Sequence, residues 1–215
     1  MSMQKVAVLG SGTVGETLAN GFLKHGYAVM RASREPAKLA AWVQGKANAS
    51  TGTFEEAAAY GDIVVLAVKG TAAESLVKGL ADALAGKVVL DATNPIADKP
   101  PQDGMLTFFT SLTDSLMERL VAAAPKAHFV KAFSSVGNAN FVNPSFGGVL
   151  PTMFICGNDA AAKAKVAAVL EQFGWEAADM GVAAAARVIE PLCILWCIPG
   201  MLHNQWTHAF KLLKR

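Results

Sequence analysis

A glycine-rich segment near the N-terminus has the residue types and spacing of a phosphate-binding loop. Gly10, Gly12 and Gly15 form a G-x-G-x-x-G pattern between the apolar run Val6–Leu9 and a helical pattern. In that context the first glycine permits a tight turn, the second lets the backbone approach a pyrophosphate, and the third lets helix and strand pack closely. The helix N-terminus adds free N–H groups and the positive end of its dipole. We therefore predict a dinucleotide site, the alternative being a turn without a ligand, with a loop formed by Gly10, Ser11, Gly12, Thr13, Val14 and Gly15.

The residues after the second predicted strand select between cofactors. An NAD site uses an Asp or Glu about 20 residues beyond the glycine pattern to bind the ribose 2′-hydroxyl. Here Ser33 and Arg34 stand at the strand tip, and Lys38 follows one helical turn later. A hydroxyl, a guanidinium and an ammonium suit a 2′-phosphate, which the guanidinium can bind through two hydrogen bonds. The sequence predicts NADP(H) rather than NAD(H), and the alternative is a basic turn on the surface.

Two further predicted strands end in segments that we expect near the nicotinamide. Ligands of open α/β sheets lie outside the carboxyl ends of the strands. Asn94 could hydrogen-bond the carboxamide or the ribose, or form only the turn before Pro95. Lys69 could reach either the cofactor or solvent. The predicted contacts at this end are Ala67, Val68, Lys69, Asn94 and Pro95.

These loops need a frame of alternating strands and helices. Short apolar runs alternate with helical patterns, and the crossovers between them require a parallel, doubly wound sheet. Strands are expected at residues 6–9, 27–32, 63–68, 87–91, 128–133 and 153–156 and around Trp175, and helices at 14–25, 35–44, 54–60, 72–84, 115–123, 160–173 and from 183 onward. The expected fold class is α/β, a Rossmann-type, mainly parallel sheet with a small α+β C-terminal extension. We expect an NADP-binding domain at residues 1–133 and an extension at 134–215 that forms the acceptor cleft and a dimer contact.

Composition narrows the class of protein. Hydrophobic residues make up 53% of the 215 residues and charged residues 17%, which excludes a disordered chain. A net charge of +2 gives no case for nucleic acid. The most apolar stretch, Leu192–Ile198, lies between two prolines and is much shorter than the about 20 residues of a membrane-spanning helix. Without a signal peptide either, the expectation is a cytoplasmic protein with no membrane partner.

Other chemistry-bearing residues form no recognisable centre. Cys156, Cys193 and Cys197 include no CxxC pair, so we expect buried thiols and neither a disulfide framework nor a metal site. The histidines are scattered, although His203 could donate a proton. Asp91 lies in a buried strand, where it could simply bond neighbouring loop amides. No catalytic residue is assigned.

Several separated segments resemble the NADP oxidoreductase family that depends on the deazaflavin coenzyme F420. The same domain occurs as the cytoplasmic part of the six-transmembrane metalloreductases. The likeness spans nearly the whole chain, and its most diagnostic element is the Ser33-Arg34 pair. The other matching segments are residues 10–15 with Thr13, 62–68, 89–95, 130–133, 179–181, 186–187 and 190–192, together with Lys38.

The resemblance implies an activity. In that family, the positions matching Thr13, Ser33, Arg34 and Lys38 hold the adenosine phosphate end of NADP(H). The deazaflavin occupies a cleft that would lie here under the loop Ser134–Gly137, with Gly200 and Met201 in its wall.

The expected function is therefore hydride transfer between NADP(H) and coenzyme F420 or a flavin-like acceptor. Transfer between stacked rings needs proximity and exclusion of water more than an acid or base, which would explain the missing catalytic pair. Two alternatives remain: another small electron acceptor or donor, such as a quinone or carbonyl compound, or a non-catalytic NADPH-sensing module. A homodimer is expected.

Overall fold

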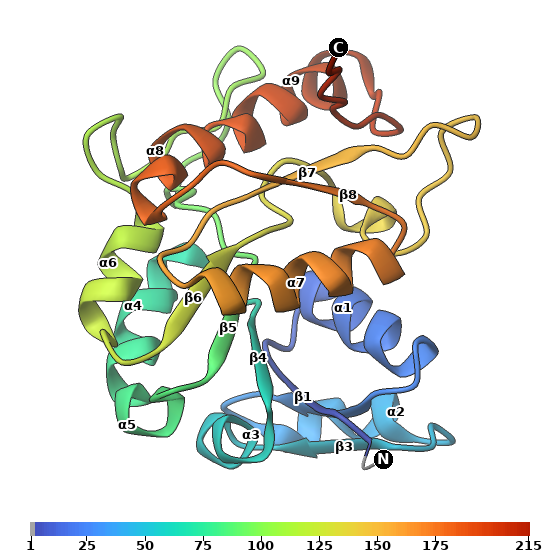
Figure 1. Cartoon of the computed structure of the whole chain (residues 1–215), viewed down its shortest axis with the longest axis vertical. Coiled ribbons are helices and arrows are strands. Elements are labelled where there is room, and N and C mark those ends of the chain that lie inside the picture. The colour runs from blue at the N-terminus through green and yellow to red at the C-terminus, as the bar shows by residue number, and fades with distance from the viewer. Residues whose placement is uncertain (1–2) are drawn as a thin grey trace.

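A six-stranded parallel sheet forms the centre of the molecule (Figure 1). The structure, a computed structural model, describes residues 3–215. The strand order is β3-β2-β1-β4-β5-β6, and every neighbouring pair is parallel. The order reverses between β1 and β4, which creates the switch point where such sheets bind ligands. The strands are β1 (Lys5–Leu9), β2 (Ala28–Ala32), β3 (Ala49–Gly52), β4 (Ile63–Leu66), β5 (Val88–Asp91) and β6 (His128–Lys131). The Rossmann-type α/β prediction is confirmed.

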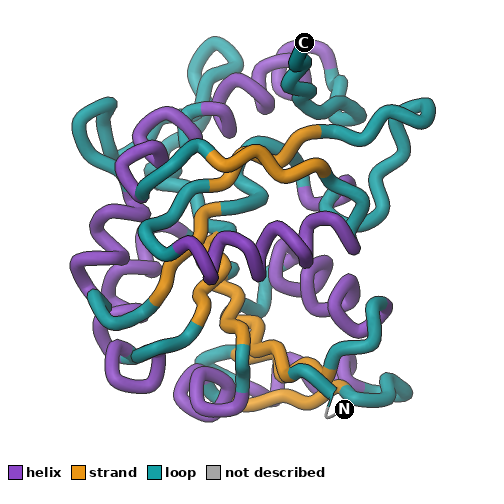
Figure 2. Tube along the Cα trace, viewed as in Figure 1, coloured by secondary structure: helices purple, strands orange, loops and turns teal. Residues whose placement is uncertain are grey.

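Helices cover both faces of the sheet (Figure 2). Because neighbouring side chains of a strand point to opposite faces, β1 contributes Val6 and Val8 to one apolar cluster and Ala7 and Leu9 to another. The first cluster contains α1 and α7, and the second contains α3, α4 and α6. Burial on both faces explains the continuous apolar runs of these strands. The helices are α1 (Thr13–Lys24), α2 (Ala40–Val43), α3 (Phe54–Tyr60), α4 (Gly70–Gly79), α5 (Ala81–Leu84), α6 (Leu116–Ala123) and α7 (Ala160–Gln172).

The C-terminal third adds a second, smaller sheet. Strands β7 (Thr152–Ile155) and β8 (Glu176–Asp179) pair in parallel through the crossover helix α7. A single antiparallel bridge between Lys131 and Cys156 joins this sheet to β6. Short helical turns η3 (Ala183–Ala185) and α8 (Ala186–Ile189) then lead into α9 (Leu192–His203), which lies at the end of the molecule opposite the N-terminus (Figure 1). One apolar cluster includes residues from both sides of residue 133, so the expected domain boundary does not coincide with a break in the core.

Several elements differ from the sequence-based expectation. The helix expected at residues 72–84 divides at Leu80 into α4 and α5, and the helical structure expected from residue 183 onward ends at His203. Strand β3 was not predicted, because Ala49-Ser50-Thr51-Gly52 contains no bulky apolar side chain and lies, half-buried, at the sheet edge. The helix expected at residues 35–44 divides into the 3₁₀ turn η1 (Pro36–Leu39) and the single turn α2. Pro36 occupies the first position of that 3₁₀ turn, where its missing N–H is not needed.

The C-terminal helical segment is longer than the seven-residue apolar stretch on which the expectation of no membrane-spanning helix was based. Ala183–His203 forms an almost continuous helical run of 21 residues with a mean hydropathy of 1.5, so by length and composition it could cross a membrane. The expectation based on seven residues between two prolines was therefore too strict. In this structure the segment is packed through Glu190, which is 1% exposed and bound to the central sheet through Lys131. Such a contact favours a helix belonging to the folded domain.

Candidate dinucleotide site

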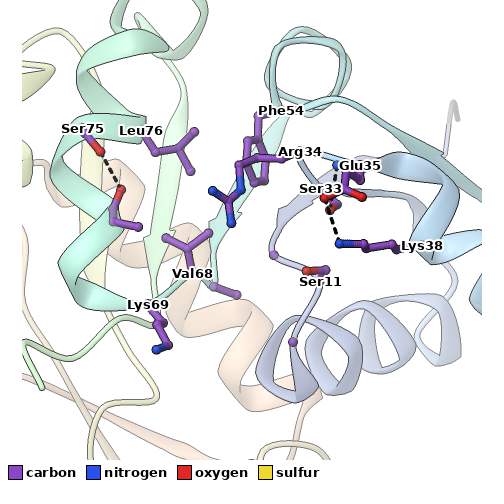
Figure 3. Close-up of a pocket in the computed structure, with 14 residues that line it drawn as sticks. Ser11, Ser33, Arg34, Glu35, Lys38, Phe54, Val68, Lys69, Ser75 and Leu76 are labelled. Carbon is purple, nitrogen blue, oxygen red and sulfur yellow. Dashed lines mark hydrogen bonds and ion pairs between the residues drawn. The ribbon is translucent and has the colours of Figure 1, made fainter. Parts of the chain in front are cut away.

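Two adjoining cavities lie at the carboxyl ends of the central strands. The first, of about 600 Å³, extends from the glycine-rich loop to the ends of β2 and β4 (Figure 3). The second, of about 530 Å³, extends from the same loop to the ends of β4 and β5. They share Gly12, Ala67, Val68 and Lys69, so together they form one continuous cleft at the switch point. The predicted residues that line it are Gly10, Ser11, Gly12, Thr13, Val14, Ser33, Arg34, Lys38, Ala67, Val68, Lys69 and Asn94.

The three glycines of the loop have different surroundings. A Cβ on Gly10 would lie 2.2 Å from the carbonyl oxygen of Ala67, and one on Gly15 would lie 2.5 Å from the carbonyl oxygen of Gly10. Both positions therefore need glycine for packing. A Cβ on Gly12 would meet nothing within 4 Å, because this residue faces the open cleft. Gly12 is also the N-cap of α1 and provides no side-chain cap, so the first N–H groups of that helix are free to bind an anion.

The end of β2 presents a hydroxyl and two cations to the first cavity. Ser33 is 5% exposed, and its Oγ accepts a hydrogen bond from the N–H of Glu35 at 3.1 Å, which leaves the hydroxyl hydrogen free to donate. Arg34 is exposed and extends into the cavity (Figure 3). Lys38 pairs with Glu35 at 2.8 Å, and the hydrogen bond and charge of Lys38 lower the pKa of that carboxyl. Glu35, which was not among the predicted site residues, is thus a carboxylate that competes for Lys38 inside the cleft.

The residues predicted at the nicotinamide end separate into lining and supporting positions. Lys69 lines both cavities and forms an exposed pair with Asp98 at 3.4 Å. Asn94 lines the second cavity, and its Nδ2 donates to the carbonyl oxygen of Ser134 at 3.4 Å. Pro95 is buried and outside the cavity lining, and its carbonyl accepts a hydrogen bond from Phe109. Gly15 is likewise a packing position beneath the loop.

A buried cluster of charges lies next to the second cavity, beside Thr93. Lys131 Nζ is 2.6 Å from Asp91 Oδ2 and 3.0 Å from Glu190 Oε1, and these side chains are 0–1% exposed. Lys131 also donates to the carbonyl oxygen of Thr93 at 2.9 Å, next to Asn94. The Thr93 hydroxyl in turn donates to Asp91 Oδ1 at 2.6 Å. Asp91 therefore bonds loop groups, as considered from the sequence, and also an ion-pair network that the sequence did not reveal.

Electrostatics explain how this cluster is tolerated. Burial lowers the pKa of Lys131, but the attraction of Asp91 and Glu190 outweighs burial and raises it above the usual value. Glu190 accepts the backbone N–H groups of Leu116 and Met117 at the start of α6, where the helix dipole favours a negative charge. The network thus ties β5, β6 and α6 to the segment between α8 and α9. Lys131 was not among the predicted site residues. A charged residue inside an apolar strand pattern could have pointed to it.

A second charge inside a strand pattern was also missed. Arg31 in β2 is 1% exposed and its guanidinium donates to the carbonyl oxygens of Gly10, Ser11 and Gly12 at 2.8–3.2 Å. Its remaining nitrogen pairs with Glu16 Oε2 at 3.0 Å. Arg31 thus lies beneath the whole turn of the glycine-rich loop.

The remaining candidates lie outside the cleft. Cys156 and Cys193 are buried and Cys197 is half-buried, all as free thiols, and burial raises the pKa of Cys156 to about 12. His203 is exposed near the end of α9. Gly200 packs against the Trp206 ring, and neither it nor the loop 134–137 lines the two cavities described above.

Comparison with known proteins identifies the class. Residues 5–95 match the family described as NADP oxidoreductase coenzyme F420-dependent. A solved structure from Arthrobacter sp. FB24, described as a "putative F420 dependent NADP-reductase", superimposes with a TM-score of 0.91 at 30% identity and covers 99% of this chain and 100% of that chain. Rat metalloreductase STEAP3 is 32% identical over 204 residues, which are 92% of this chain and 39% of the relative, so the chain spans about two fifths of that protein. An imine reductase from Streptomyces aurantiacus, at 20% identity and a TM-score of 0.67 over 93% of this chain and 63% of that chain, shares the fold.

The sheet topology and the cleft at its switch point are those of a Rossmann-type α/β protein. The chain belongs to the NADP oxidoreductase family, coenzyme F420-dependent, and is an NADP-dependent oxidoreductase.

Proposed function

We propose that this protein binds NADP(H) along the cleft and transfers a hydride between it and a deazaflavin or flavin-like acceptor. One observation carries the cofactor assignment: the Ser33 hydroxyl, Arg34 and Lys38 face the same cavity as the glycine-rich loop. The adenosine 2′-phosphate would meet these three groups, and the pyrophosphate would meet the N–H groups at the start of α1. The nicotinamide would then lie between the β4 and β5 ends, near Val68 and Asn94.

The protein's part in the chemistry is positioning. NADPH, when bound, would supply a hydride, which carries both electrons, and the acceptor would take up this hydride together with one proton from solvent. The cleft floor at Ala67 and Ala92 is apolar and almost fully buried, which suits a site that orients a ring and excludes water. The match to the coenzyme F420-dependent family and the likeness to the Arthrobacter protein support a deazaflavin acceptor. A quinone or carbonyl acceptor, or an NADPH sensor, is the alternative.

The test is steady-state oxidation of NADPH, followed at 340 nm, against coenzyme F420, FMN, FAD, a soluble quinone and a panel of carbonyl compounds. We expect turnover with coenzyme F420 to exceed turnover with every other acceptor by at least about tenfold. Gly12→Val, in which the side chain would fill the pyrophosphate position, serves as the inactive control. If only a quinone or a carbonyl compound is turned over, that compound class is the acceptor and the deazaflavin assignment is wrong. Micromolar NADPH binding without turnover of any acceptor would indicate a sensor.

Location, domain division and assembly complete the proposal. We propose a cytoplasmic homodimer, with a nucleotide domain at residues 1–133 and an extension at 134–215 that carries the contact. Exposed apolar side chains support the contact: Val182, Val188, Leu195 and Leu202 are each 53–62% exposed along the C-terminal helical segment. Sedimentation velocity should show a dimer that Leu195→Lys converts to a monomer, whereas sedimentation with lipid vesicles would favour a membrane-binding helix.

A further inference from the structure

We propose that Arg31 is a positioning residue for the pyrophosphate of the dinucleotide, acting through the glycine-rich loop without touching the cofactor. This inference rests on the proposed function of the cleft. It concerns a side chain that lies inside β2, on the protein side of the loop, and that lines neither of the two cleft cavities.

The first step of the argument is the hydrogen bonding of the loop carbonyls. Arg31 Nε donates to Gly10 O at 3.2 Å, and one terminal nitrogen donates to Ser11 O at 2.8 Å and to Gly12 O at 3.0 Å. Three consecutive carbonyls are therefore held by one rigid, planar group. Lysine, with a single nitrogen on a flexible stem, offers no comparable fork.

The second step follows from peptide geometry. In a planar trans peptide the C=O of one residue and the N–H of the next point in opposite directions. Holding the carbonyls of Gly10, Ser11 and Gly12 toward Arg31 therefore turns the N–H groups of Ser11, Gly12 and Thr13 away from it. These three residues are exposed and line the cleft. Within residues 3–215 their N–H groups donate to no protein acceptor, which leaves them available to a pyrophosphate.

The third step is electrostatic. Burying a charge in a strand costs free energy unless it is paired, so an apolar residue would be the ordinary choice for this position. Arg31 is instead covered by the Trp42 ring, 5.5 Å from its Cζ, and shares its charge with Glu16, which is 52% exposed. A fixed positive charge thus lies behind the loop, where it attracts the two negative charges of a pyrophosphate on the other side.

The experiment compares two ligands by isothermal titration calorimetry. NADPH contains the pyrophosphate, whereas adenosine 2′-monophosphate carries only the phosphate expected at Ser33 and Arg34. For Arg31→Met we expect NADPH to bind roughly thirtyfold or more weakly. The carbonyls of Gly10 and Ser11 lose the guanidinium donor, the carbonyl of Gly12 keeps only the N–H of Glu16, and the charge is lost. Binding of adenosine 2′-monophosphate should change by less than about twofold.

Two control variants separate the hydrogen bonds of Arg31 from its charge and from its packing on the Trp42 ring. Lys46 also lies over the Trp42 ring, at 5.4 Å, and binds no loop carbonyl, so Lys46→Met should leave the affinity for NADPH within about twofold. Arg31→Lys keeps the charge but not the fork, and should weaken NADPH about three- to tenfold. If Arg31→Met does not fold, Arg31→Lys decides the question by the same comparison of ligands.

Two results would overturn the assignment. One is wild-type affinity for NADPH in a folded Arg31 variant, and the other is an equal loss for NADPH and adenosine 2′-monophosphate, which would indicate general disruption. Failure of the proposed function looks different, because the wild-type protein itself would then bind neither ligand.

Discussion

The end of the cleft proposed for the phosphates of NADP(H), the phosphate end, and the end proposed for its nicotinamide, the nicotinamide end, are built from different parts of the chain. At the phosphate end, the glycine-rich loop, Arg31 and the Ser33–Lys38 turn fall within 29 consecutive residues. At the nicotinamide end, the supporting charges Asp91, Lys131 and Glu190 are separated by 40 and 59 residues. The groups proposed to hold the phosphates therefore come from one βαβ unit, although the end of β4 completes the cavity. The nicotinamide end requires the C-terminal segment to be in place.

The two ends also differ in how they hold charge. Arg31 shares its charge with one half-exposed carboxylate and three carbonyls. Lys131 lies between two carboxylates that are inaccessible to solvent, and the surplus negative charge is balanced by the start of α6. Removing the charge of Arg31 at the phosphate end should therefore weaken cofactor binding. Removing the charge of Lys131 at the nicotinamide end should lower the free energy of unfolding.

The largest effect should come from Lys131→Met. The variant leaves Asp91 and Glu190 buried without their cation, and we expect the free energy of unfolding to fall by about 3–5 kcal/mol. Urea denaturation monitored by circular dichroism measures this change. Lys211→Met, which removes a solvent-accessible pair with Glu176, should leave the free energy of unfolding nearly unchanged, because exposed ion pairs contribute little. If the free energy of unfolding falls equally in the two variants, the buried network contributes no more to stability than an exposed ion pair.

The next effect concerns the glycine-rich loop. Gly12→Val should leave the thermal midpoint nearly unchanged, because its Cβ meets nothing within 4 Å and its φ of −79° suits any residue. It should weaken NADPH at least about a hundredfold, since the side chain occupies the pyrophosphate position. Gly10→Val is the matched variant, in which the Cβ would lie 2.2 Å from Ala67 O. Gly10→Val should weaken NADPH binding and also lower the thermal midpoint. If the two variants have the same thermal midpoint, Gly10 is not needed for packing in the way that the structure indicates.

Features that depend on short segments could be predicted from the sequence, whereas contacts between distant segments could not. The parallel, doubly wound sheet and most of the predicted residues that line the cleft followed from patterns within short segments, where glycine spacing and apolar runs carry the information. Strand β3 was missed because an edge strand of small polar residues has no apolar pattern. Arg31 and Lys131 interrupt apolar strands, a visible signal, but their partners depend on packing between distant segments. The role of Glu190 was invisible, since nothing near it in sequence points to α6.

The assignment of the 2′-phosphate predicts a smaller, selective effect. Arg34→Ala should reduce NADPH affinity by about 1.5–3 kcal/mol, the range of a hydrogen bond to a charged group, which is roughly ten- to 150-fold. NADH lacks the 2′-phosphate and should bind with nearly unchanged affinity. Calorimetric titration of both cofactors tests this expectation. If both weaken to the same extent, Arg34 does not read the 2′-phosphate.

The smallest effect concerns a second ion pair between the same helices that Glu190 connects. Arg187 of α8 binds Glu118 of α6 through two hydrogen bonds of 2.9 and 2.7 Å, both carried by partly exposed side chains. The hydrogen bond from Arg187 lowers the pKa of Glu118 below its ordinary value near 4.5. A lowered pKa in the folded state means that the stabilisation is present above the unfolded pKa and is lost as the pH falls through the folded one.

Glu118→Gln should therefore cost no more than about 1 kcal/mol at pH 7, because exposed pairs contribute little. Urea denaturation of both proteins between pH 7 and pH 2 should show a difference that is constant down to about pH 4.5 and then disappears, since the wild-type carboxyl also becomes neutral. Lys131 behaves in the opposite sense. Its raised pKa places the loss of its contribution on the alkaline side, so acid should remove the contribution of the Glu118 pair and leave Lys131 charged. A difference that grows as the pH falls would mean that Glu118 does not stabilise the contact through its charge, and that the buried network alone holds the C-terminal segment to α6.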